Sequence, residues 1–264
     1  SDTLWIECTN ARYPLGYRHS SIAGHQVLLV KEEGGEMIRV SDYPDSLRLK
    51  SETVDVELMA DGTAVCKGQR RLVLNNVEPY IGFRSLDAKA QFRAIMSGNS
   101  FNPTDFTILS VEDNFNDWTS MEPDEEYIPE LRICYSYNVK DYAKAAGDRI
   151  FMDMNPFAKK LYSDRSPRIN DMVINSETTL SDTVRINLPA GYIPESLPSS
   201  GIVESQFGCL ATEVTQSEDQ SVVTIVQTFR FYPGRFPKEV YADYRTFARS
   251  VSRIYDAKIV LVRK

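Results

Sequence analysis

The chain has 264 residues and a net charge of −7, with 42% hydrophobic and 25% charged residues. This ordinary globular composition excludes disorder of the whole chain, and the length suits one large domain or two. Lys and Arg are scattered and the longest apolar runs have four or five residues, so we expect neither nucleic-acid binding nor a membrane span.

The N-terminal region predicts a strand and a hairpin. Residues 2–10 alternate large apolar and polar side chains, but the next fifteen residues offer this segment no β-partner. The runs 27–31 and 36–40 flank Glu33-Gly34-Gly35, which is a hairpin pattern. We therefore expect residues 1–30 to pack on the following domain or to project from it, without a core of their own.

Two further runs predict a second hairpin. Residues 53–59 alternate apolar and acidic side chains, and Asp61-Gly62 then turns the chain into 63–74. Asp-Gly between two β runs is the strongest short-range hairpin signal. Later strands are expected at 105–111, 130–140, 148–154, 171–176, 182–188, 209–215 and 221–232.

Two helices interrupt the strands. The first has apolar residues at helical spacing between Ala88 and Met96, with Ser85 as a candidate cap and an end at residues 97–99. The second begins near Pro237 and carries one apolar stripe. The run 259–262 is typical of a strand covered on both faces, and we expect the helix to cover one of them. The stripe consists of Val240, Tyr244, Phe247, Val251 and Ile254.

These elements predict a mainly β fold, sandwich-like and antiparallel, with two packed helices; an α+β fold is the second choice. Polar segments at 41–50, 112–130 and 155–170 read as loops, and the segment 112–130 holds eight carboxylates. The last of the three loops is a possible division between two domains.

The residues that usually carry chemistry are sparse. The sequence has no GxSxG, P-loop, GxGxxG or HExxH motif. The four cysteines lie far apart, which excludes a CxxC site and favours buried free thiols, although long-range disulfides stay open. They are Cys8, Cys66, Cys134 and Cys209.

Two patterns could hold a metal ion but fit poorly. His19 and His25 could share a strand face, but no Asp, Glu or Cys lies between them, which favours exposed loop histidines. The segment 113–117 resembles a calcium loop, but Phe115 and Trp118 occupy positions that calcium loops give to an oxygen ligand and to glycine. We therefore expect no metal and no cofactor.

Two clusters of side chains have a structural and a binding interpretation. The aromatic residues between Phe229 and Phe236 could line a sugar-binding face, but aromatics that lead into a helix are more often core. Arg245, Arg249 and Arg253 line up on the second helix, where nearby Asp243 indicates a solvent face with ion pairs.

Short motifs in order along the chain carry a resemblance to a known family. The N-terminal motifs resemble the end of a transglutaminase-like domain of multi-domain bacterial proteins, and the later ones resemble the uncharacterised β-rich domain that follows it. The N-terminal motifs are Asp2-Thr-Leu-Trp-Ile-Glu-Cys-Thr9, Pro14-Leu-Gly16-Tyr17 and Val27-Leu-Leu-Val30. The later motifs are Leu188-Pro-Ala-Gly191-Tyr192, Leu197-Pro198, Phe207-Gly208, Tyr232-Pro-Gly-Arg235 and Lys258-Ile-Val-Leu261.

The resemblance implies an incomplete catalytic site. The family uses a Cys–His–Asp triad, and Glu7 occupies the position of its acid. The nucleophile and the base would both precede Ser1, and Cys8 does not match the nucleophile. An acid that orients no base has no catalytic role, so we expect this chain to be inactive.

The resemblance therefore implies a non-catalytic accessory or interaction domain. Residues 1–35 would be the end of the transglutaminase-like domain, and residues 36–264 a β-rich domain that packs on it or presents a surface for an unidentified protein or glycan. The expected location is the periplasm or the cell exterior. The alternative is a stand-alone β-sandwich that binds carbohydrate or peptide.

Overall fold

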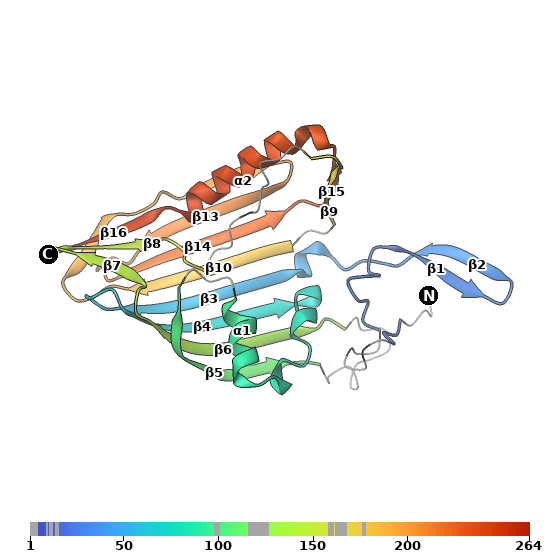
Figure 1. The fold of residues 1–264 in the computed structure, drawn as a ribbon, viewed down its shortest axis with the longest axis horizontal. Helices are drawn as coiled ribbons and strands as arrows, with labels where there is room; N and C mark the ends of the chain where they lie inside the picture. Colours follow the sequence, from blue (N-terminus) through green and yellow to red (C-terminus); the bar gives the residue numbers. More distant parts are fainter. Residues whose placement is uncertain are drawn as a thin grey trace.

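The computed structural model describes residues 5–8, 10, 13, 16–97, 101–115, 127–157, 161, 168–175 and 178–264. Its largest element is an eight-stranded sheet (Figure 1). All neighbouring strands in it are antiparallel except β3 and β10, which run parallel. In spatial order the strands are β12 (Gly201–Ser205), β13 (Gly208–Gln216), β14 (Val222–Phe231), β10 (Thr178–Asn187), β3 (Leu49–Leu58), β4 (Ala64–Val73), β6 (Glu130–Val139) and β5 (Pro103–Asp113).

A four-stranded sheet packs on one face of the large sheet, which we call the inner face. Its order is β11 (Tyr192–Ser196), β16 (Lys258–Arg263), β8 (Arg149–Asp153) and β7 (Ala143–Ala146). Side chains of β8 and β16 share one core cluster with inner-face residues of β3, β4 and β6. Two small pairs complete the strands, β1 (Gln26–Lys31) with β2 (Gly34–Arg39), and β9 (Met172–Ile174) with β15 (Gly234–Phe236).

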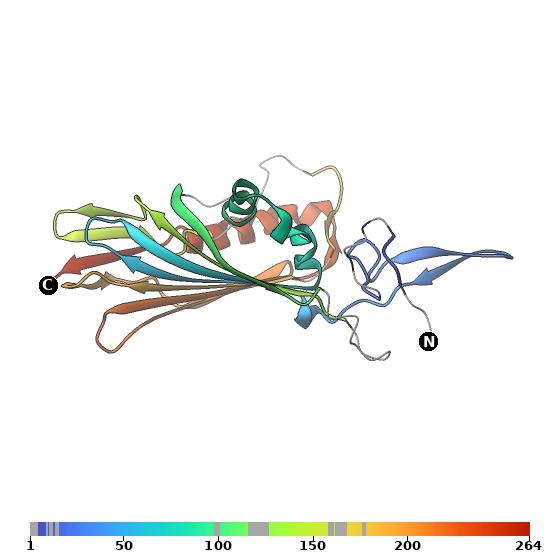
Figure 2. The same cartoon turned by 90° about the horizontal axis from the view of Figure 1, so that it is seen from below.

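Both helices cover the same inner face, as Figure 2 shows. Helix α1 (Ala88–Met96) buries Ile95 and Met96. Its cap is Asp87, whose carboxylate accepts a hydrogen bond from the Ala90 N–H at 2.7 Å, rather than the expected Ser85. Helix α2 (Tyr241–Tyr255) follows a 3-10 turn that begins after Pro237.

Side chains along the strands of the large sheet alternate between buried and exposed, because one face of the sheet is covered and the other faces solvent. In β3, Val54, Val56 and Leu58 are buried while Asp55 and Glu57 are exposed. The Asp61-Gly62 turn joins β3 to β4 as expected, and the Thr63 N–H bonds the Asp61 carboxylate at 2.9 Å. Gly62 has φ +90°, and a Cβ there would lie 2.2 Å from the Ala143 carbonyl oxygen, so this turn requires glycine.

The structure confirms the mainly β, sandwich-like fold with two packed helices, and both predicted hairpins form. The strands expected at 105–111, 130–140, 148–154, 209–215 and 221–232 all form close to those bounds. Strand β10 begins at Thr178, earlier than expected, and the strand expected at 171–176 is the short β9. Strands β7, β11, β12 and β15 were not predicted, since they are short and β11 contains Pro194.

Two expectations are corrected. Residues 5–8 belong to no strand: the Trp5 carbonyl accepts one backbone hydrogen bond from the Gly16 N–H at 2.9 Å, but no ladder forms among the described residues, and residues 1–4 and 9 lie outside them. The run 259–262 is not covered equally on both faces: Ile259 and Leu261 are buried against the large sheet, whereas Val260 and Val262 are only half-buried. Most of α2 packs instead on the part of the large sheet formed by β12, β13 and β14.

Among the described residues, the core has three parts. The largest lies between the two sheets and α1, a second lies beneath α2, and a small third one surrounds Tyr17 and Tyr43. Pairing between β3 and β10 joins segments on either side of 155–170 in one sheet. The domain boundaries at residue 35 and near 155–170 stay predictions.

Candidate functional site

A row of polar side chains crosses the inner face of the large sheet. Strand register places Thr212 beside Gln227, Gln227 beside Asp182, Asp182 beside Glu52, and Glu52 beside Arg70. All five belong to neighbouring strands, and we call them the polar row. It runs between the main core cluster and the cluster beneath α2. Buried polar side chains in such a place require partners.

The Arg70 end of the row is fully bonded. Arg70 Nε lies 2.5 Å from Glu52 Oε2, and its Nη1 donates to the Tyr80 hydroxyl at 2.9 Å. Its Nη2 donates to the Ile95 carbonyl at 3.0 Å, near the C-terminus of α1, where a positive charge is favourable. The other Glu52 oxygen accepts a hydrogen bond from the Tyr135 hydroxyl. This end ties α1 to the sheet.

The other end of the row is held by a loop residue. Asn155 Nδ2 donates to Gln227 Oε1 at 2.8 Å and approaches Asp182 Oδ2 at 3.5 Å. Gln227 Nε2 in turn donates to Thr212 Oγ1 at 3.3 Å. Asn155 Oδ1 accepts the Phe157 N–H at 3.0 Å, which fixes the orientation of the amide. Asp182 is therefore the most weakly bonded member.

The pKa values of Asp182 and of the nearby Tyr255 are both raised. Burial and, after it, the Glu52 carboxylate raise the pKa of Asp182 to about 6, although Asn155, Lys50 and Arg70 oppose the shift. Burial and the Asp182 carboxylate raise the pKa of Tyr255 as well. Asp182 thus changes charge in a pH range where most carboxyl groups are already ionised.

A cavity of about 70 Å³ opens beside Asp182. This volume is far smaller than the roughly 300–1,000 Å³ of a site for a drug-sized ligand. Polar groups and apolar walls are mixed around it. Besides members of the polar row, the lining includes Lys50, Ile95, Ser97, Phe157, Leu180, Phe229 and Tyr255.

Sequence reasoning missed the polar row, although a signal for it exists. Glu52 is in phase with the buried Val54 and Val56, and Asp182 is in phase with Val184 and Ile186. A charged residue at a core-facing position of an alternating strand is unusual. The sequence does not show, however, that β3 pairs with β10 and brings the two carboxyl groups together.

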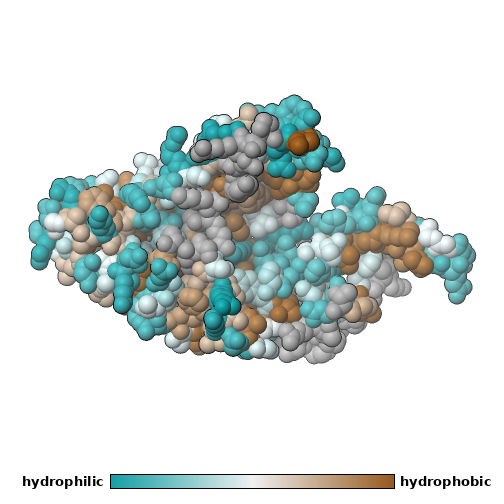
Figure 3. Space-filling model, in the orientation of Figure 1, coloured by the Kyte–Doolittle hydropathy of each residue, from teal (hydrophilic) through white to brown (hydrophobic). Residues whose placement is uncertain are grey.

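A second feature is the hairpin formed by β1 and β2, which projects from the body (Figures 1 and 2). The turn is Glu32-Glu33, with Gly34 at φ +135°, one position before the expected centre. Leu28, Val30 and Met37 are each more than half exposed. They form an apolar patch, and Figure 3 shows brown, apolar surface over the projecting hairpin.

The base of the hairpin is anchored to the body by aromatic and acidic groups. Tyr17 stacks on Tyr43 and donates a hydrogen bond to Glu78 at 2.7 Å. Glu78 also accepts the Ser20 N–H at 2.8 Å, and its other oxygen lies 3.3 Å from His19 Nε2. His19 therefore belongs to this anchor, and not to a pair with His25.

The residues singled out by the resemblance lie apart from the polar row. Cys8 is exposed. Glu7 contributes, after burial and Glu78, to raising the pKa of Tyr13 to about 12. Within the described parts of the chain, no cluster of His, Cys, Asp or Glu is arranged to hold a metal ion. In the acidic segment, Asp113 pairs with Arg84 at 2.6 Å, and residues 116–126 lie outside the described residues.

The structure places the aromatic residues between Phe229 and Phe236 and the arginines of α2, for which the sequence left two interpretations open. Phe229, Phe231 and Phe236 pack in the core beneath α2, which confirms the structural interpretation for them. Tyr232 instead donates its hydroxyl to Glu204 at 3.0 Å. Arg249 and Arg253 are exposed on the outer side of α2.

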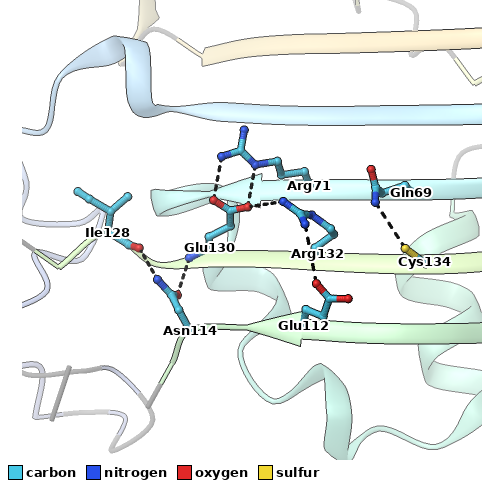
Figure 4. Close-up of polar contacts among 8 residues, drawn as sticks. All are labelled: Gln69, Arg71, Glu112, Asn114, Ile128, Glu130, Arg132 and Cys134. Atoms are coloured by element: carbon cyan, nitrogen blue, oxygen red, sulfur yellow. Dashed lines mark hydrogen bonds and ion pairs between the residues drawn. The ribbon is translucent and has the colours of Figure 1, made fainter. Parts of the chain in front are cut away.

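The outer face of the large sheet carries charges that neutralise one another (Figure 4). Glu130 binds Arg71 through two hydrogen bonds of 2.7 and 2.8 Å, and Arg132 at 3.3 Å. Hydrogen bonding to Arg71 lowers the pKa of Glu130. Asn114 ties the ends of β5 and β6 together by accepting the Glu130 N–H at 2.8 Å and donating to Ile128. The two arginines and two glutamates of this network, Arg71, Arg132, Glu112 and Glu130, balance one another in charge.

Comparison with known families identifies part of the chain. Residues 148–261 match the family DUF3858, a domain of unknown function with a solved structure. The match covers less than half of the chain and runs from β8 into β16, so it includes Asp182, Gln227 and Asn155 but not Glu52 or Arg70. No curated protein matches the chain. In the described residues, no helix is long and apolar enough to cross a membrane.

Proposed function

We propose that this chain is a non-catalytic accessory domain of a transglutaminase-like protein, and that the β1–β2 hairpin, whose first strand lies in the part that resembles the end of the catalytic domain, packs on the rest of that upstream domain. The observation that carries the proposal is the projecting apolar hairpin. The family match to an uncharacterised domain at residues 148–261 supports the C-terminal half of the resemblance. The transglutaminase-like parent and a periplasmic or extracellular location rest on the resemblance alone.

The hairpin supports docking because its apolar side chains lack cover. Val30 is 78% exposed and Leu28 60% exposed. A two-stranded hairpin is marginally stable by itself in water, and an exposed apolar patch commonly marks an interaction site. The occupant we propose is the preceding domain, since residues 2–9 and 27–30 resemble its end and the second of these segments lies in the hairpin itself.

The cysteines support a non-catalytic role. Burial raises the pKa of the Cys66 thiol to about 12, so it stays protonated near neutral pH and is a poor nucleophile. Among the described residues, no cysteine has a histidine as a hydrogen-bond partner, as a Cys–His pair would require. The His19 imidazole instead contacts Ser21 and Glu78.

The test compares the chain alone with the longer protein encoded by its gene. Hydrogen exchange of residues 26–39 should be fast in the chain alone and strongly slowed in the longer protein. Val30→Asp should restore fast exchange there and leave the chain alone folded. The matched control is Ile202→Asp, since Ile202 is 70% exposed on an edge strand of the large sheet.

Two outcomes would overturn the proposal. One is a gene whose upstream sequence encodes no domain with a catalytic Cys and His. The other is exchange in the hairpin that is equally fast in both proteins, because a docked hairpin must be protected.

A further inference from the structure

The cavity beside Asp182 is balanced in charge. Two cationic side chains, Lys50 and Arg70, and two carboxyl groups, Glu52 and Asp182, line it. Arg70 is already paired with Glu52. A cationic ligand would meet the first pair of charges and an anionic ligand the second, so a neutral ligand suits the cavity best.

The cavity nevertheless offers hydrogen-bonding groups with spare capacity. Asp182 Oδ2 has only the 3.5 Å approach of Asn155, and the other oxygen bonds none of the described residues. The Tyr255 hydroxyl likewise bonds none of the described residues, although it faces the electrostatic field of Asp182. A carboxyl group accepts from O–H donors, and a phenol both donates and accepts.

The remaining walls are apolar. Phe157, Phe229, Leu180 and Ile95 also line the cavity. A ligand that fits must therefore combine C–H surface with adjacent donors and acceptors. Because the cavity volume is only about 70 Å³, it encloses a small part of such a ligand.

We propose that this cavity binds the hydroxylated edge of a neutral ligand, namely two or three adjacent carbons with their hydroxyl groups, as in a small polyol or one side of a sugar. Asp182 accepts from one hydroxyl and Tyr255 bonds its neighbour, while the carbon atoms lie against Phe157 and Phe229. The site is separate from the hairpin, so its test does not depend on the docking proposal. It would serve the alternative function of a carbohydrate-binding module.

The test uses small probes that differ mainly in charge. Glycerol and ethylene glycol, which are neutral, are titrated into the ¹⁵N-labelled full chain at millimolar concentrations, beside ethanolamine and glycolate. We expect saturable shifts at the amides of Glu52, Asn155, Asp182 and Gln227 with the neutral probes, and weaker binding of the charged ones. The midpoint of the Asp182 titration should also fall when glycerol is present, because a hydroxyl donor stabilises the carboxylate.

Variants assign the binding to this cavity. Asp182→Asn should weaken glycerol binding at least fivefold, and Tyr255→Phe should weaken it too, which keeps the test decisive if one variant does not fold. The matched control is Asp55→Asn, since Asp55 pairs with Arg185 on the outer face. Shifts that do not saturate, that persist in both variants, or that are exceeded by ethanolamine or glycolate would overturn the proposal.

Discussion

Two apolar runs of nearly the same composition end up in opposite environments. Strand β1 reads QVLLVK and strand β16 reads KIVLVR. In β1, Val30 is 78% exposed, whereas Leu261 in β16 is completely buried. Both have six residues with a basic residue near the end, and both lie in antiparallel pairs.

The difference comes from what lies beside and beneath each strand. Strand β16 pairs with β8 on one side and β11 on the other, and Ile259 and Leu261 point at the large sheet. Strand β1 pairs only with β2, and no layer of the described chain covers Leu28 or Val30. The same pattern therefore stabilises the fold in one place and leaves an exposed apolar surface in the other, where we propose docking.

The largest effect should come from the helix that covers the second core cluster. Phe247 lies on the buried side of α2, so Phe247→Ala should lower the free energy of unfolding by about 3–5 kcal/mol. Arg249→Ala, on the exposed side of the same helix, should change it by less than about 0.5 kcal/mol. Urea unfolding measures both. Equal, small losses would mean that α2 is peripheral and that its stripe is another docking surface.

A matched pair of leucines tests the comparison directly. Leu261→Ala should destabilise the chain by about 2–5 kcal/mol because it leaves a cavity in a packed core. Leu28→Ala removes the same atoms from an exposed hairpin and should cost only a few tenths of a kcal/mol. The midpoint of chemical unfolding distinguishes them. A large loss from Leu28→Ala would show that the hairpin is packed in solution, contrary to our interpretation.

A smaller effect is expected at the polar row, where the core is not apolar. The pKa of Asp182 rises from 3.8 to about 6 on folding, so its contribution to stability is lost as pH rises through that interval. Asp182→Asn should therefore become more stable relative to the natural chain as the pH rises from about 4 to about 6. Above about pH 6, the difference in the free energy of unfolding should stay constant, about 1–3 kcal/mol larger than its value below about pH 4. The measurement is the difference in unfolding free energy against pH. A difference independent of pH would contradict the burial of this carboxyl group.

The last prediction is that no activity is measured, and it concerns the N-terminal residues Glu7 and Cys8. The chain should show no transglutaminase or amidase turnover, because among the described residues no cysteine has a histidine as a hydrogen-bond partner. Cys8→Ser should leave that result unchanged in an assay with casein or glutamine peptides. Turnover that disappears in Cys8→Ser would make Cys8 a nucleophile and contradict the non-catalytic proposal.

Local pattern was sufficient for much of the fold but not for the site. Alternation predicted β3 and β4, Asp61-Gly62 predicted their turn, and the stripe through Phe247 predicted α2. It did not predict the short strands such as β7, whose sequence AKAA has no alternation. It also did not reveal the polar row, since Glu52 and Asp182 are 130 positions apart and meet only through the parallel pairing of β3 with β10.

The sequence by itself determined the class of fold, the main hairpins and both helices, because periodicity and turn chemistry are local properties of the chain. Only the tertiary structure decided which apolar runs are buried, as β1 and β16 show. It also decided where buried charges meet, because burial and charge pairing depend on the layer that covers each strand and on the register of its neighbours.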